Sequence, residues 1–337
     1  MLTEEISKRF WITRFLMIIG IVILHLPPYE PLSEVGCSAF SLVKAFFAHG
    51  LFRATVPVLT VISGYLVFYS NLHLRPLELF KKKTKSILVP LALWNLPIAI
   101  AVFFVQKYQI LGDQFSAQLY PPSLFDWLNA LIGVTADPVN YPLNFLRDLF
   151  VISVLSPVLW LFLKRIPYVG LVTVLMIWYL NLDGDLILRT SMLVNFYIGG
   201  LAAVLRWDLT VLDKHATWCL FLLIGICVGI VVLRIENKEL FRLTSPFLVW
   251  PSMKLLVGTR MGEWLYRHAS SSFFIFLSHS VVLFALWLIF QKSPASELYF
   301  VYWLSTPPIT VMFLIFMHRK FRELAPRLSL VFLGGRE

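Results

Sequence analysis

The sequence predicts an all-α polytopic membrane protein with about ten transmembrane helices. Three observations support this prediction. Apolar residues make up 58% of the 337-residue chain, charged residues make up only 14%, and apolar runs long enough to cross a bilayer recur along it. A soluble protein of this size needs more charge to cover its surface. The same balance excludes a disordered chain, a collagen-like fibre and a disulfide scaffold.

A bilayer core about 30 Å thick requires about 20 apolar residues per helix. Residues 124–134 are too few to span and contain Trp127, which favours a helix lying in the interface. No internal repeat or low-complexity segment divides the chain, so we expect one transmembrane domain covering residues 1–337. The predicted spans, of which the fifth and eighth are short, are residues 11–29, 46–70, 86–106, 143–163, 167–181, 186–205, 216–233, 243–258, 270–290 and 299–317.

The distribution of basic residues predicts that both termini are cytoplasmic. With this orientation, 19 of the 29 lysines and arginines fall in inner segments and 6 in outer loops. Such an asymmetry follows the positive-inside rule. The net charge of +10 is therefore explained by cytoplasmic loops, and we expect no nucleic-acid partner. The three cysteines have no metal-ligand spacing, so we also expect no metal site.

The first predicted span contains two ionisable residues, Arg14 and His25. Eleven residues at 100° each return a helix to within about 20° of its starting direction, so both side chains share one face, about 16 Å apart along the axis. Ionisable groups inside a membrane are costly and are functional candidates by default. Taken singly, Arg14 could extend to the headgroups and His25 could be a satisfied interior histidine.

The second predicted span places Arg53 at about the depth of His25. A guanidinium cannot lose its charge there and needs an acceptor, which is a carboxylate, a carbonyl or a ligand anion. Pro57 removes a backbone donor in mid-span, and Gly64 permits close approach of another helix. For the proline and the glycine, a structural kink is the simpler interpretation.

Further polar residues follow in the later spans. Asn95 lies in an apolar helix and needs a partner, either another helix or a substrate. Arg147 and Asp148 point about 100° apart on a helix and are not natural partners for each other. They could hold a sugar-like acceptor or complete an interhelical network. His279 lies near the middle of its span, where a histidine relays protons or bonds across helices.

Several motifs follow one another in order along nearly the whole chain. They are Arg14 with His25, Phe52-Arg53-Ala54-Thr55-Val56-Pro57 with Ile62-Ser63-Gly64-Tyr65, Lys81 to Lys85 with Pro90 and Trp94, Asn144-Phe145-Leu146-Arg147-Asp148 with Pro157, Tyr197-Ile198-Gly199-Gly200, and Phe276-Leu277-Ser278-His279. This ordered set resembles the integral-membrane acyltransferase 3 family.

The resemblance implies a bacterial inner-membrane enzyme. Such an enzyme moves an acyl group, often acetyl or succinyl, from a cytosolic donor such as acyl-coenzyme A to a hydroxyl of an envelope glycan, lipid-linked sugar or exopolysaccharide. Some members carry an extracytoplasmic hydrolase-like domain. This chain ends about 20 residues after the last predicted span, so we expect no such domain. The sequence departs from the family at Leu26, where a second histidine often follows the first.

Together, the residues and the resemblance give a hypothesis for the site. His25 acts as general base on the acceptor hydroxyl. Arg14, with Lys83 or Lys85 from the basic loop, holds the phosphates of acyl-coenzyme A, a donor substrate, and no permanently bound cofactor is needed. Arg53 or Asn95 stabilises the oxyanion. We assign acceptor binding to Arg147, Asp148, His279 and Tyr65.

Three alternatives stay open. Within the enzyme hypothesis, an acyl-His25 intermediate would replace direct transfer. A proton-coupled transporter or flippase of a glycan or lipid precursor would also use intramembrane arginine and histidine, although no inverted repeat is evident. A purely structural membrane subunit would not explain why Arg53, His25 and His279 lie inside predicted spans.

Overall fold

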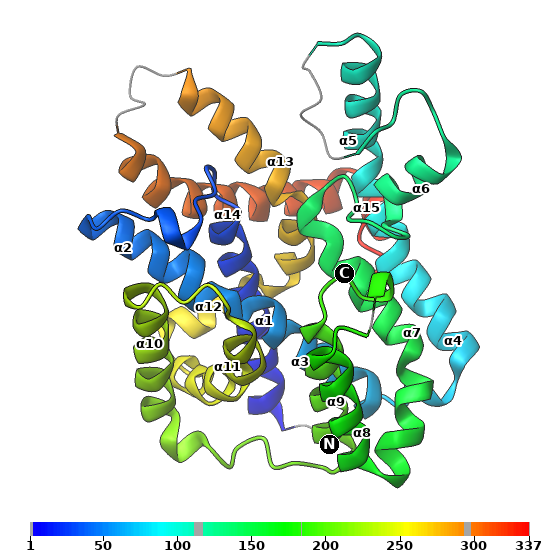
Figure 1. The fold of residues 1–337 in the computed structure, drawn as a ribbon, viewed down its shortest axis with the longest axis vertical. Coiled ribbons are helices and arrows are strands. Elements are labelled where there is room, and N and C mark those ends of the chain that lie inside the picture. Colours follow the sequence, from blue (N-terminus) through cyan, green and yellow to red (C-terminus); the bar gives the residue numbers. More distant parts are fainter. Residues whose placement is uncertain (1–2, 111–116, 183, 293–297, 337) are drawn as a thin grey trace. The chain divides into compact units, whose positions relative to one another are not determined.

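The structure is a computed structural model that describes residues 3–110, 117–182, 184–292 and 298–336. Over this part of the chain every regular element is helical and there is no strand, which confirms the all-α prediction (Figure 1). Internal packing divides the chain into two compact units, a division that the sequence did not indicate. Unit 1 comprises Met1–Ser63 and Leu205–Lys320, and unit 2 comprises Gly64–Val204 and Phe321–Glu337.

Unit 1 brings the start of the chain together with its last third. Helix α1 packs against α12 and α13, and α10 packs against α11 (Figure 1). Helix α3 begins in this unit and ends in unit 2, and α14 does the same near the C-terminus. The helices are α1 (Glu4–Leu24), α2 (Ala39–Ala45), α3 (Thr55–Tyr69), α10 (Ala216–Val232), α11 (Glu239–Ser252), α12 (Arg260–His268), α13 (Ser272–Gln291) and α14 (Tyr299–Leu324).

Unit 2 contains the middle of the chain and the C-terminal segment. Helix α7 packs against α8 and α9, α6 packs against α5, and the C-terminal α15 also packs against α5. The helices are α4 (Pro76–Lys83), α5 (Val89–Lys107), α6 (Leu124–Ile132), α7 (Asn144–Arg165), α8 (Pro167–Tyr179), α9 (Ser191–Val204) and α15 (Pro326–Phe332). Short 3₁₀ or π turns are η1 (Leu32–Glu34), η2 (Phe46–Gly50), η3 (Leu51–Ala54), η4 (Leu72–Leu74), η5 (Thr84–Leu88), η6 (Tyr141–Leu143), η7 (Gly184–Leu186), η8 (Asp213–His215), η9 (Met253–Leu256) and η10 (Ala269–Ser271).

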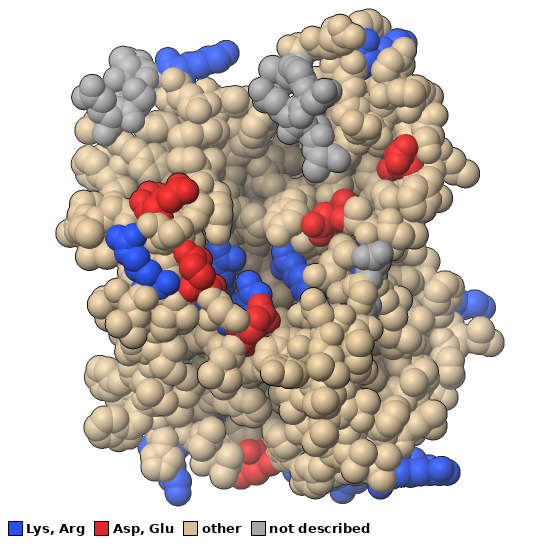
Figure 2. Space-filling view, in the orientation of Figure 1, with Lys and Arg blue, Asp and Glu red and all other residues tan. Residues whose placement is uncertain are grey.

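Six helical stretches in the described part of the chain are long and apolar enough to cross a bilayer. The fifth and sixth predicted spans are helical but shorter, α1 carries several charges, and α11 has only 14 residues. The count of ten spans and the orientation therefore stay predictions. Uncharged residues cover most of the face in Figure 2. The six stretches are Ala39–Tyr69, Pro76–Lys107, Tyr141–Arg165, Asp213–Val232, Arg260–Gln291 and Tyr299–Leu324.

The stretch Ala39–Tyr69 is irregular just before Pro57. A π turn, η2, and a 3₁₀ turn, η3, precede α3, whose first turn contains Pro57. Proline has no N–H to donate and its ring excludes the carbonyl four residues earlier, which here belongs to Arg53. The expected distortion is present, and Arg53 lies within it.

Gly64 lies where α3 meets α9. A Cβ atom at this position would overlap the backbone carbonyl of Phe196. Only glycine, which has no side chain, lets the two helices come this close. The close approach expected at Gly64 is therefore confirmed.

Candidate functional site

Two histidines from distant parts of the sequence meet in unit 1. His25 directly follows the last residue of α1, and His279 lies in α13, where its side chain is fully buried. Because α1 packs against α13, the two rings stand edge to face with their centroids 5.3 Å apart. A second histidine, which is absent beside His25 in the sequence, thus lies next to it in space and comes from another helix.

The hydrogen bonds of both histidines determine their tautomers. The Nδ1 atom of His25 lies 2.9 Å from the carbonyl oxygen of Ile21, and that of His279 lies 2.8 Å from the carbonyl oxygen of Phe276. Since a carbonyl only accepts, we assign the proton of each neutral ring to Nδ1, which makes Nε2 the basic nitrogen. The Nε2 atom of His279 is buried and has no hydrogen-bond partner in the described part of the chain.

Helix α1 carries two arginines with different surroundings. Arg9 is 1% exposed, donates to Asp213 at 2.8 Å and to the carbonyl of Trp250, and stacks on the Trp250 ring. Arg14 is half-buried and lies over the ring of Trp11, 5.2 Å from its centroid. Among the described residues, Arg14 has neither a hydrogen bond nor an ion pair. Its guanidinium can therefore accept an anion.

Arg53 lies in η3, which packs against α1. Its Nε donates to the carbonyl of Ala48 at 2.9 Å. A Cβ at Gly20 would overlap the Phe52 ring, so the segment that carries Arg53 lies against α1 five residues before His25. This contact places the segment that contains Arg53 near the end of α1, which His25 follows.

Other cations lie near Arg53. Burial lowers the pKa of the Lys238 ammonium, and the charges of Arg53 and Arg242 lower it further, while Glu236 acts in the opposite direction. Lys238 follows Asn237 in the segment before α11 and is 8% exposed. Lys238 is paired with Glu236 and Arg242 with Glu239, so carboxylates balance two of these three cations.

The lysines assigned to the donor belong to unit 2, whereas Arg14 belongs to unit 1. Lys83 is half-buried at the end of α4, and Lys85 is exposed in η5. Arg336 donates to the carbonyl of Ser86 at 2.8 Å, so the C-terminal segment packs beside this loop. A phosphate site shared by Arg14 and these lysines stays a prediction.

Asn95 is fully buried in α5 and is engaged locally. Its amide nitrogen donates to the carbonyls of Leu91 and Leu131, and its oxygen accepts from the backbone N–H of Asn140 at 2.9 Å. These bonds join α5 to the end of α6 and to the loop before α7. Asn95 thus has a partner in the protein, and an oxyanion role stays a prediction.

Arg147 and Asp148 form a buried ion pair, with Nη1 and Oδ1 2.9 Å apart. The expectation that these neighbours are not partners is wrong. The rule rests on Cβ directions in a helix, and the long arginine side chain reaches across the difference. Arg147 also donates to the carbonyls of Gly133, Val134 and Leu186, and the carboxylate accepts from the backbone N–H groups of Leu188 and Arg189.

These contacts match the interhelical-network alternative for Arg147 and Asp148. They tie α7 to the loop after α6 and to η7. Tyr65, also assigned to the acceptor, is buried in α3 and stacks on Tyr69 with ring centroids 5.6 Å apart. Binding of an acceptor by Arg147, Asp148, His279 or Tyr65 stays a prediction.

Comparison with known proteins decides the family. Residues 10–318 match the profile Acyl_transf_3, described as an acyltransferase domain. The chain belongs to this acyltransferase family. It is 32% identical to the succinoglycan biosynthesis protein ExoH of Rhizobium meliloti (strain 1021), over 98% of this chain and 93% of the relative. No solved structure gave a significant match. Because its described part contains six helical stretches long and apolar enough to cross a bilayer, the acyltransferase is an integral membrane protein.

Two features of this acyltransferase were missed in the sequence. Arg9 was counted only as a cytoplasmic charge, because nothing in the local sequence indicates partners 204 and 241 residues away. A pocket next to the end of α1 was also missed, although Tyr29, Glu30 and Glu34 in the segment after His25 are a signal for it. The described residues contain no cluster of three metal-ligating side chains.

Proposed function

We propose that this acyltransferase moves an acyl group, acetyl or succinyl, from cytosolic acyl-coenzyme A to a hydroxyl of an envelope or secreted glycan in the bacterial inner membrane. Family membership supports acyl transfer, and the name of the relative, a succinoglycan biosynthesis protein, supports a polysaccharide acceptor. The observation that carries the proposal is the contact between His25, at the end of α1, and His279 of α13, with the Nδ1 atom of each ring next to a backbone carbonyl, which leaves Nε2 to take a proton.

In the proposed reaction His25 is the general base. As the acceptor hydroxyl attacks the thioester carbonyl, its proton passes to Nε2 of His25 and a C–O bond forms. The C–S bond then breaks, the proton passes to the leaving thiolate, and free coenzyme A and an ester result. His279 accepts a hydrogen bond from the protonated His25 and stabilises its positive charge.

Arg14 is proposed to bind a donor phosphate. Its half-buried guanidinium, without an ion pair or hydrogen bond among the described residues, supports this role. The pantetheine arm would then follow α1 towards His25, about 16 Å further along the helix axis. This path requires the N-terminus to be cytoplasmic.

Of the two candidates for oxyanion stabilisation, Arg53 is preferred over Asn95. The segment that carries Arg53 packs against α1 close to His25, whereas the amide of Asn95 already forms three hydrogen bonds with backbone groups of the protein. A charged donor in a dry site contributes about 3 kcal/mol to the transition state.

The test uses purified protein, radiolabelled acyl-coenzyme A and a glycan acceptor. Wild-type protein should release thiol and label the glycan, and His25→Ala should abolish both while retaining donor binding. Initial rates measured at varied concentrations of donor and acceptor separate the two mechanisms. An acyl-His25 intermediate requires ping-pong kinetics, and direct transfer does not. Transport of labelled sugar into proteoliposomes without thiol release from any acyl donor would instead establish the transporter alternative.

A further inference from the structure

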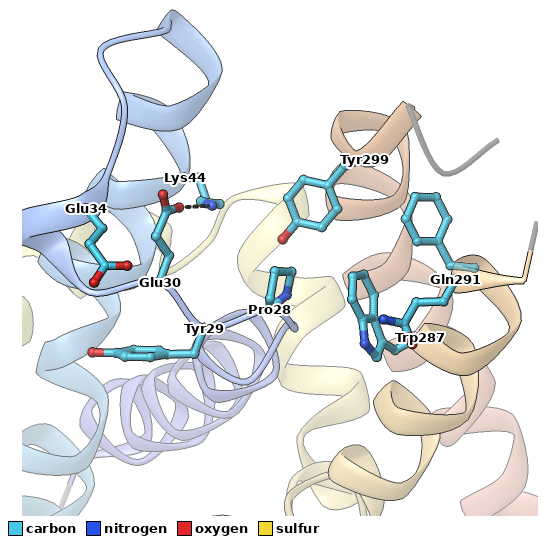
Figure 3. A pocket seen from close by; sticks show the side chains of 9 residues that line it. Pro28, Tyr29, Glu30, Glu34, Lys44, Trp287, Gln291 and Tyr299 are labelled. Carbon is cyan, nitrogen blue, oxygen red and sulfur yellow. Dashed lines mark hydrogen bonds and ion pairs between the residues drawn. The ribbon is translucent and has the colours of Figure 1, made fainter.

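A pocket of about 640 Å³ opens in unit 1 beside the end of α1 (Figure 3). One wall comes from the segment after His25, which contributes Pro28 and Tyr29. The opposite wall comes from the end of α13 and the start of α14, which contribute Trp287 and Tyr299. The family relationship and the relative's name assign no residue of this pocket.

Aromatic rings form much of the pocket wall. The rings of Trp287 and Tyr299 meet edge to face at 6.2 Å, and Phe290 stacks on Trp287 at 5.7 Å. The Tyr299 hydroxyl donates to the carbonyl of Pro27 at 3.1 Å, which fixes this ring beside the chain that follows His25. Tyr29 is 68% exposed. Such amphipathic faces suit a ligand with one flat apolar side and a polar rim.

The polar groups of the pocket have an excess of negative charge. Glu30 forms an ion pair with Lys44, and its backbone carbonyl lies 2.9 Å from Nε2 of His49. Glu34 has no ion pair within the described part of the chain, and Gln291 adds an exposed amide. The two carboxylates accept hydrogen bonds from hydroxyl groups, and because they outnumber the one ammonium, the pocket disfavours an anionic ligand.

We propose that this pocket binds an uncharged pyranose unit of the acceptor glycan and discriminates against uronic acids and other carboxylated sugars. A pyranose offers a flat C–H face to the aromatic rings and hydroxyls to Glu34 and Gln291. This inference rests on the proposed function. The pocket residue Pro28 lies three residues after His25, a chain length that spans at most about 11 Å, so the bound sugar lies near the proposed base.

Binding is measured first without an acyl donor, by saturation-transfer NMR and tryptophan fluorescence on the purified full chain. The probes are neutral tetrasaccharides of glucose and of galactose, and tetragalacturonate as the acidic counterpart. We expect the neutral probes to bind and tetragalacturonate to bind at least about fivefold more weakly. Trp287→Ala should weaken neutral binding roughly tenfold, and Trp287→Phe should retain most of it. Glu34→Gln should reduce the discrimination against tetragalacturonate.

The control replaces Trp218, an exposed tryptophan of α10 outside the pocket, with alanine, which should leave binding unchanged. Thermal unfolding confirms that each variant is folded. Equal binding of neutral and acidic probes, no binding of any neutral probe, or unchanged binding in Trp287→Ala would overturn the inference. If these results accompany His25-dependent acyl transfer, the pocket assignment alone fails. Absence of transfer from any acyl donor contradicts the proposed function instead.

Discussion

His25 and His279 are separated by most of the chain, yet their rings are in edge-to-face contact and each donates Nδ1–H to the backbone of its own helix. The two residues therefore present the same tautomer, and a proton taken by His25 has a second imidazole beside it. This relationship makes His279 a candidate positioning residue for the proposed base.

Replacing His279 with glutamine should lower kcat about 10-fold or more and leave KM for the donor unchanged, because only stabilisation of protonated His25 is lost. The matched control is His268→Gln. His268 has a similar backbone bond, from Nδ1 to the carbonyl of Trp264 at 2.8 Å, and lies in α12. Steady-state kinetics over a range of pH checks both variants. A kcat and pH profile equal to wild type in His279→Gln would remove this residue from the mechanism.

The two arginines of α1 should give opposite phenotypes. Arg14→Ala should raise KM for the acyl donor about 10-fold or more without lowering the melting temperature, because among the described residues its guanidinium has no hydrogen bond or ion pair to lose. Arg9→Ala should destabilise the protein by about 3 kcal/mol, because it leaves Asp213 without its partner. Donor titrations and thermal unfolding in detergent distinguish the two effects. Normal donor binding by Arg14→Ala contradicts the phosphate assignment.

Gly64→Ala should destabilise the protein by about 1–3 kcal/mol, because the new methyl group overlaps the carbonyl of Phe196. Gly225 in α10 is the control, since a Cβ there meets no atom within 4 Å. Gly225→Ala should be neutral or slightly stabilising, because alanine favours a helix. Thermal unfolding measures both, and equal stability of the two variants would show that the helices separate readily.

The exposed Cys37 provides a test of orientation. If the N-terminus is cytoplasmic, the segment after α1 faces outward, and a membrane-impermeant maleimide should label Cys37 in intact spheroplasts. The Cys37→Ser variant measures the background, because Cys219 is partly exposed and Cys227 is buried. Labelling only after the membrane is opened would reverse the predicted orientation.

Stability should fall in mild acid because of His73, which lies in η4 between two candidate spans. Burial lowers the pKa of His73 below its ordinary value of 6.5. The unfolded chain therefore binds a proton near pH 6.5 that the folded chain does not, so this contribution is complete above pH 6.5 and decreases as the pH falls below it. His73→Phe keeps an aromatic ring next to Trp160 but cannot titrate. Between pH 7.5 and 5.5 the melting temperature of this variant should fall less than that of wild type. An equal fall would show that His73 is not a cause of the loss of stability in acid.

Hydrophobic length and the cost of buried charge account for what could be predicted from sequence. They predict the helical fold and identify His25, Arg53 and His279 as unusual residues. They do not predict which residues meet, because contacts such as that between His25 and His279 depend on packing between distant segments. The error at Arg147 has a different cause, since a rule for side-chain directions says nothing of how far a guanidinium reaches.

Arg9 ties the first helix to partners that lie 204 and 241 residues later in the chain. During synthesis the ribosome must add Asp213 and then Trp250 before this arginine can bury its charge. Until that point, the helix that presents Arg14 and His25 has no partner for its first buried cation. Packing of the helix that carries the proposed base is therefore completed only after residue 250 has been added.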